Sequence, residues 1–303
     1  MDDQTSAAGQ AAQDGVNRRS LIGHFGAAAA TVLATGAAAT GGVVLASLPA
    51  AAQAVTDNDI LNFALNLEYL EGEYYIRGFL GRGLDPADVG DPNGVGNAGF
   101  VLGGSAVPFK TAAVAGVIER ITVDEVDHIR FIRRVLGNAA VARPNVDLLN
   151  SFNALAVAAG LIPAGTQFNP FADEISFLLG ALSLTDVGVT AYAGAAALLQ
   201  SKDNLAASAS ILAAESYHAG SLRTLLATFG QQGVFNAISA VRARLGNGKE
   251  AGLSIPNFNY NIAPVDSDGL IYRRTSAEVL NIVYNGVPTG GGFFPSRANG
   301  TIR

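Results

Sequence analysis

Cysteine and tryptophan are absent from the 303-residue chain, and its single methionine is Met1. Without cysteine the protein can form no disulfide, no thiolate metal site and no cysteine nucleophile. Any metal ion must therefore bind through nitrogen and oxygen ligands. The body of the chain also lacks both sulfur side chains that oxidants attack, so peroxide should damage it only slowly.

Charged residues are scarce as well. They make up only 15% of the chain, the formal net charge is -6 and the isoelectric point is about 5.0. Such a chain offers no basic surface for a phosphate backbone, so we expect no nucleic-acid partner. Hydrophobic residues, by contrast, make up 49% of the chain. A protein of this length and composition can bury a substantial core, as one large domain or two small ones.

The first part of the chain, residues 1–54, has the order of a signal peptide. A polar start is followed by Arg18 and Arg19 and then by an uncharged stretch rich in alanine and glycine. This order resembles a twin-arginine signal, and the small residues ending at Ala54 predict cleavage after that residue. We therefore expect a periplasmic or extracellular protein that is exported by the twin-arginine route. The alternative is that the stretch is retained as a membrane anchor.

Apolar periodicity, with helix start and stop signals, predicts an all-α protein built on a four-helix bundle. The long helices are expected at about 57–80, 108–137, 171–200 and 204–229. Since only a short turn separates the last two, they should be antiparallel neighbours. Segment 81–107 is rich in Gly, Asp, Pro and Asn, which predicts a long loop, and its length suggests a crossover connection.

The rest of the chain is expected to hold only short helices, at about 147–159, 234–245 and 276–284. The predicted organisation is a signal peptide over 1–54, a bundle over 55–230 and a C-terminal tail over 231–303. Because the tail is rich in apolar residues, it should wrap around the bundle instead of extending into solvent.

Two histidines lie beyond the predicted signal peptide, His128 and His218, and each follows a glutamate by three positions, Glu125 and Glu215. Residues three apart share one face of a helix, so each motif directs a carboxylate and an imidazole to the same spot. A single motif of this kind is usually a solvated pair. Two motifs on separate helices, with one further acid from each of two others, form the ligand set of di-iron and di-manganese carboxylate bundles.

The other two long helices must then each supply an acid. On the first helix we choose Glu68, which lies on the apolar face with Leu65, although Glu71 could replace or assist it. On the third helix the candidate is Asp186, because an aspartate among apolar residues is costly to bury without a partner. Tyr75 is a candidate to act at the site, since its hydroxyl could hydrogen-bond a ligating carboxylate.

Several stretches resemble the ferritin-like family that includes plant desiccation-related proteins; they are 62–71, 124–130, 186–192 and 292–295. The resemblance extends over nearly all of 57–303 and implies a ferritin-like four-helix bundle. With the motifs, it implies two iron or manganese ions held by Glu68, Glu125, His128, Asp186, Glu215 and His218. Asp186 departs from the longer glutamate that is usual at such sites. Its shorter side chain would hold one ion weakly or make the site mononuclear.

Two such ions with open coordination positions would support redox chemistry with oxygen or peroxide, either iron(II) oxidation or manganese-type peroxide dismutation. We therefore expect an exported metal-binding oxidoreductase of stress protection, with metal ions and oxygen or peroxide as its partners. The alternatives are a non-catalytic desiccation- or stress-related protein with a vestigial metal site, and iron storage in a cage. The sequence leaves homo-oligomerisation open.

Overall fold

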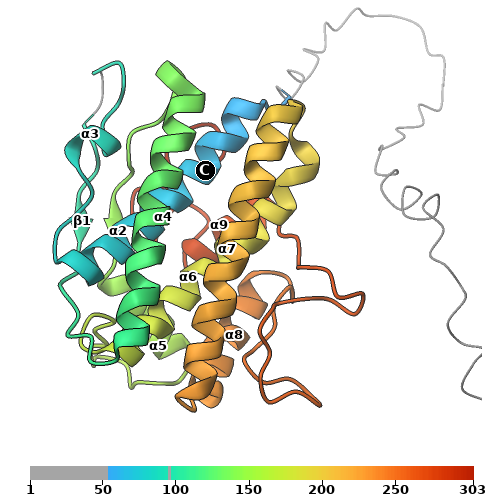
Figure 1. Ribbon diagram of the computed structural model, residues 1–303. Coiled ribbons are helices and arrows are strands. Elements are labelled where there is room, and N and C mark those ends of the chain that lie inside the picture. The colour runs from blue at the N-terminus through green and yellow to red at the C-terminus, as the bar shows by residue number, and fades with distance from the viewer. Residues whose placement is uncertain (1–53, 95–96) are drawn as a thin grey trace, which may run out of the picture. The chain divides into compact units, whose positions relative to one another are not determined.

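The computed structural model describes residues 54–94 and 97–303, and these form one compact unit. The predicted signal peptide, apart from Ala54, lies outside the described residues. Within the described ranges the chain forms eight α-helices, α2 to α9, while strand is limited to two short pieces (Figure 1). The prediction of an all-α bundle is therefore confirmed.

The bundle consists of four long helices: α2 (Asp57–Leu80), α4 (Ala112–Leu136), α6 (Glu174–Ala195) and α7 (Lys202–Thr228). They match the predicted helices to within a few residues at each end. The other helices are α3 (Pro86–Val89), α5 (Asn150–Ala158), α8 (Gln232–Leu245) and α9 (Ser276–Val283), with 3-10 turns η1 (Gly137–Ala139) and η2 (Ala196–Leu198). Strands β1 (Val101–Leu102) and β2 (Val146–Asp147) pair in parallel. This pairing ties the loop after α2 to the segment after α4.

Neighbouring helices of the bundle run antiparallel. Asn62, near the start of α2, donates from Nδ2 to the carbonyl of Ala139 just beyond α4, at 2.8 Å. Towards the other end of α2, the hydroxyl of Tyr74 donates to the carbonyl of Phe177 near the start of α6, also at 2.8 Å. Figure 1 shows α4 and α7 side by side at the front, with α2 and α6 behind them.

The long crossover is the connection 137–173, whereas we expected it at 81–107. Because α2 packs along α4, segment 81–107 joins two neighbouring helices, while α4 and α6 do not pack along each other. The amide of Val107 donates to the carbonyl of Gly78 at 2.8 Å, which returns this loop to the end of α2. The loop length alone did not reveal which helices are neighbours.

The ends of α2 are fixed by local signals in the sequence. The Thr56 side chain accepts from the Asp59 amide, and the Asp59 side chain accepts from the Thr56 amide, which is a capping box. At the other end Gly81 adopts φ 70°, the left-handed conformation that glycine allows at helix ends. These caps fix the length of α2 and so the depth at which Glu68 lies in the bundle.

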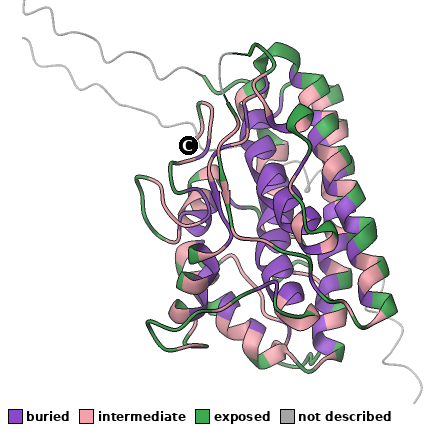
Figure 2. Ribbon diagram, turned by 90° about the vertical axis from the view of Figure 1, so that its left-hand side faces the viewer, coloured by how far each residue is buried: buried purple, intermediate pink, exposed green. Residues whose placement is uncertain are grey.

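Two helices of the bundle are buried on all sides. In α6 every residue from Phe177 to Tyr192 is buried, and in α2 every residue from Ile60 to Ile76 (Figure 2). By length and composition, α6 with η2 is also apolar enough to cross a membrane, but a helix that is hydrophobic all round is equally typical of a protein core. Here its apolar faces are covered by the rest of the protein.

The C-terminal tail supplies part of that cover, as predicted. The amide of Asn299 donates to Oδ1 of Asn66 on α2, and Nδ2 of Asn66 donates back to the carbonyl of Asn299, both at 2.9 Å. The amide of Arg274 donates to the carbonyl of Thr190 on α6 at 3.1 Å. Phe294 near the end of the tail is fully buried. The tail therefore packs against the two inner helices and pairs the side chain of Asn66 and the carbonyl of Thr190.

Candidate metal centre

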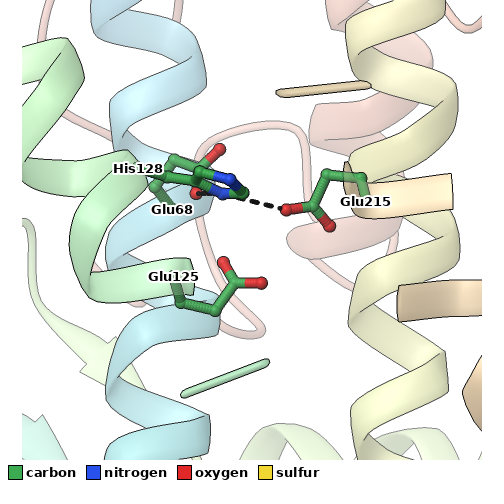
Figure 3. A group of neighbouring side chains, drawn as sticks. All are labelled: Glu68, Glu125, His128 and Glu215. Carbon is green, nitrogen blue, oxygen red and sulfur yellow. Dashed lines mark ion pairs between the residues drawn. The ribbon is translucent and has the colours of Figure 1, made fainter. Parts of the chain in front are cut away.

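Carboxylates and an imidazole from three of the long helices meet inside the bundle. They are Glu68 of α2, Glu125 and His128 of α4, and Glu215 of α7. One ligand atom from each lies within 4.8 Å of the others. Figure 3 shows the carboxyl groups of Glu125 and Glu215 turned toward the same space, with His128 facing Glu215. The arrangement agrees with the expectation that both motifs point into the bundle.

His218 of α7 lies against the same group. Its Nδ1 is 3.3 Å from Oε1 of Glu125 and 3.7 Å from Oε1 of Glu215. Nδ1 of His128 is 3.2 Å from that same Glu215 oxygen, and the two imidazole centres are 6.1 Å apart. Glu215 therefore lies between the two imidazoles, and both rings direct Nδ1 at the carboxylates.

Most of the polar atoms at this centre are buried without a hydrogen-bond partner. They are Oε2 of Glu68, both carboxylate oxygens of Glu125 and Glu215, and Nδ1 of His128 and His218. The atoms approach one another, but not with hydrogen-bond geometry. Since nearly all buried polar groups in proteins are paired, such a convergence needs another partner. Carboxylate oxygens and imidazole nitrogens are ligands of iron and manganese, so the donor set fits these ions.

The imidazoles and carboxylates shift each other's ionisation. Burial alone would lower the pKa of His128, but the charge of Glu68 and contacts with Glu215 and Glu68 raise it to about 11. Burial would raise the pKa of Glu215, but contacts with His128 and His218 lower it to about 2. In the metal-free protein, a proton on His128 therefore balances the charge of the carboxylates around it.

Two further acids cannot ionise so easily. Burial, followed by repulsion from Glu215, raises the pKa of both Glu71 and Glu125 well above the usual range. Glu71 adds a fourth buried carboxyl group to this region of the bundle. Two imidazoles cannot neutralise four carboxylates, and a divalent cation is the natural way to balance such a site.

The structure brings five of the six predicted ligands together, but Asp186 does not join them. Its oxygens accept from Arg223 at 3.0 and 2.7 Å and from Arg242 at 2.9 Å. Although burial would raise the pKa of Asp186, the two arginines lower it. A buried aspartate did need a partner, as expected, but the partner is a pair of buried guanidinium groups. Nothing local to Asp186 in the sequence pointed to either arginine.

The tyrosine that contacts a predicted ligand is Tyr192, whose hydroxyl donates to Oε1 of Glu68. Tyr75, which we expected to hydrogen-bond a ligating carboxylate, instead bonds Oγ1 of Thr185 at 2.8 Å. Tyr192 lies six positions after Asp186, and its place in the sequence predicts a core residue only, because its contact joins α2 to α6 and no spacing along the chain marks such a pair.

Asp124 is a further residue that sequence reasoning missed. Its Oδ2 lies 3.1 Å from Nε2 of His218, the ring nitrogen that faces away from Glu125 and Glu215. A histidine that binds a metal usually donates its other N–H to a carboxylate, which fixes the ring and its tautomer. Asp124 also pairs with Arg120, which is largely exposed. Its place next to Glu125 was visible in the sequence, but the contact across α4 and α7 was not.

An all-α bundle that gathers carboxylates and imidazoles at its centre has the architecture of the carboxylate-type metal proteins. The profile of the ferritin-like domain matches residues 56–228, and the chain belongs to this family. It is 29% identical over 277 residues to ferritin-like catalase Nec2 of Nesocodon mauritianus, covering 81% of this chain and 84% of that protein. It is 27% identical over 249 residues to desiccation-related protein PCC13-62 of Craterostigma plantagineum, covering 74% of this chain and 76% of that protein. No solved structure matches significantly.

Metal uptake by this centre should release protons. An imidazole must be neutral to bind a metal, and His128 keeps its proton up to a pKa of about 11 in the metal-free protein. The raised pKa values of Glu71 and Glu125 act in the same direction. The affinity for manganese(II) should therefore rise between about pH 6 and about pH 8. Titration calorimetry in buffers of different ionisation enthalpy counts the protons, and uptake without proton release would contradict this reading of the site.

Removing the carboxylate behind His218 should weaken metal binding without removing a ligand. We expect Asp124→Asn to lower the affinity by about 10- to 100-fold, because His218 loses the charged acceptor that orients its ring and makes it a stronger ligand. The matched control is Asp127→Asn on the same helix, where the side chain is 64% exposed. Competition with a chelator measures both variants. An equal loss in the two would mean that Asp124 acts only through surface charge.

Proposed function

We propose that this protein binds two iron or manganese ions between α2, α4 and α7 and uses them for redox chemistry with oxygen or peroxide. The observation that supports the proposal most strongly is the set of buried oxygen and nitrogen atoms without hydrogen-bond partners at one place in the bundle. Their chemistry suits either metal, because both accept carboxylate and imidazole ligands. The relative named ferritin-like catalase favours peroxide as the first substrate to test.

Each residue of the centre has a distinct part in this proposal. Glu125 and Glu215 would hold the ions between them, because His218 approaches both and His128 approaches Glu215. The two histidines would each bind one ion. Glu68 would be a terminal ligand beside His128, because Oε2 of Glu68 lies 3.4 Å from Nδ1 of His128. When bound, the metal pair supplies the two-electron redox step that no side chain here can perform.

Other side chains would hold the ligands in place. Tyr192 donates to Glu68 and leaves the other carboxylate oxygen free of hydrogen bonds, available to an ion. Asp124 fixes the ring of His218. The surrounding apolar core excludes bulk water, which strengthens every charge interaction at the centre. The chain would therefore provide a rigid and nearly dry site, while the reacting molecule reaches it as a small diffusing species.

Metal analysis combined with peroxide turnover tests the proposal. The purified protein should contain about two iron or manganese ions per chain. Under dismutation, oxygen should be released as peroxide disappears, whereas iron(II) oxidation would consume peroxide without releasing oxygen. The double variant His128→Ala, His218→Ala should lose both the bound metal and the activity. Wild-type protein that takes up no tightly bound iron or manganese would contradict the proposal.

The second candidate is a non-catalytic role in desiccation or stress, which the desiccation-related relative favours. Under this alternative the bundle and its wrapped tail would act by binding stress-exposed material, and the metal site would be vestigial. The same double histidine variant separates the two functions. It should abolish protection against peroxide stress if the metal chemistry matters, and it should leave protection intact if the folded surface is sufficient.

We further propose that the protein is exported by the twin-arginine route and cleaved after Ala54. The capping box that starts α2 begins at Thr56, so this cleavage would leave the first helix intact. N-terminal sequencing of the protein from the periplasm or medium should therefore begin at Val55. Changing Arg18 and Arg19 to lysine should block export, while the same change at Arg82 should not. Recovery of the full-length chain in the membrane fraction would instead support an anchor.

A further inference from the structure

Glu71 is a buried carboxylate to which the proposed ligand set assigns no role. It lies on α2, one turn beyond Glu68, and is 5% exposed. One of its oxygens, Oε2, accepts a hydrogen bond from Oγ1 of Thr185 at 2.8 Å. Burial and the carboxylates of Glu215 and Glu68 raise its pKa, while His218 lowers it, so these three residues lie near enough to act on it. Glu71 therefore belongs electrostatically to the same centre, although it comes from an already represented helix.

The space around Glu71 is provided by a glycine on α6. A Cβ atom at Gly188 would stand 2.5 Å from Oε1 of Glu71 and 3.9 Å from Oε2 of Glu215. Any other residue at position 188 would therefore press on the Glu71 carboxylate. Position 188 also shows that α6 lies close to the centre. The helix contributes no acid there, because its acid in this region, Asp186, is hydrogen-bonded to Arg223.

A short chain of hydroxyl groups fixes the Glu71 carboxylate. Thr185 has one hydroxyl proton and donates it to Glu71, so the hydroxyl of Tyr75, 2.8 Å away, must donate to Thr185. Both residues are fully buried. These hydrogen bonds use Oε2 of Glu71, so its Oε1 is directed to the space beside Gly188 and Glu215. Tyr75 therefore acts on the centre through Thr185, as a positioning residue.

We propose that Glu71 takes the place of the acid that the third long helix would otherwise supply, and binds the metal ion on the His218 side of the centre. This inference rests on the proposed function above. Two carboxylates of α2 would then serve the two ions, with Glu68 beside His128 and Glu71 on the side of His218. The ligand set would draw on three helices, while α6 contributes space through Gly188 and a hydrogen bond through Thr185.

The inference is tested by loading the metal-free full chain with manganese(II) and measuring bound metal by elemental analysis. Wild-type protein should hold about two ions per chain and the Glu71→Gln variant about one. The exposed Glu119→Gln variant on α4 is the matched control and should load like wild type. Because Glu71→Gln replaces an acid that is hard to ionise there with a neutral side chain of the same shape, the thermal stability of the metal-free variant should not fall.

A second variant moves the carboxylate without removing it. In Gly188→Ala the new methyl group must displace Oε1 of Glu71, so the affinity for one ion should fall by about 10-fold while the other is retained. If Glu71→Gln and Gly188→Ala both hold two ions as tightly as wild type, the inference about Glu71 is wrong and the metal proposal survives. If wild type itself binds no manganese or iron, the proposed function fails with it.

Discussion

The centre of this protein is governed by the cost of burying negative charge. Glu68, Glu71, Glu125 and Glu215 all lie in the core, and the free-energy penalty for each buried ion is on the order of several kcal/mol unless it is compensated. The imidazoles offset part of this, as the raised pKa of His128 shows. The rest must be met by protonation or by a cation. Two apolar clusters pack around the same helices and contribute the favourable burial that opposes this cost.

A comparison of two buried charge clusters in the same bundle shows why only one is a candidate metal centre. Around Asp186 the arginines donate at normal hydrogen-bond distances, and Arg242 and Arg274 also pair with Glu250. Every carboxylate oxygen of Asp186 and Glu250 accepts a hydrogen bond from an arginine, and the cluster ties α6, α7, α8 and the tail together. Around Glu215, by contrast, neither carboxylate oxygen has a hydrogen-bond partner. Both clusters bury acids. They differ in whether the carboxylate oxygens have hydrogen-bond partners, and this difference distinguishes a structural network from a candidate ligand site.

The burial of the inner helices also decides which side of the centre solvent can approach. The tail covers α2 and α6, whereas both histidines come from α4 and α7. Among the ligand side chains the most accessible is His128, at 13% exposure, while Glu68, Glu125 and Glu215 are at 3% or less. The imidazoles therefore lie nearer the surface than the carboxylates, which are enclosed by the core. A small molecule could reach such a site more readily than a large substrate.

The sequence by itself determined the helices, their approximate ends and the two Glu-x-x-His motifs, because each depends only on the spacing of residues that are close together along the chain. Two side chains three positions apart on a helix lie on the same face, whatever the tertiary structure around them. Only the tertiary structure decided that Asp186 pairs with Arg223 and Arg242 instead of joining the other acids, and that Asp124 contacts His218. Each of these depends on helices that meet across the bundle, and the free energy of a buried charge is set by what lies around it in space, not along the chain.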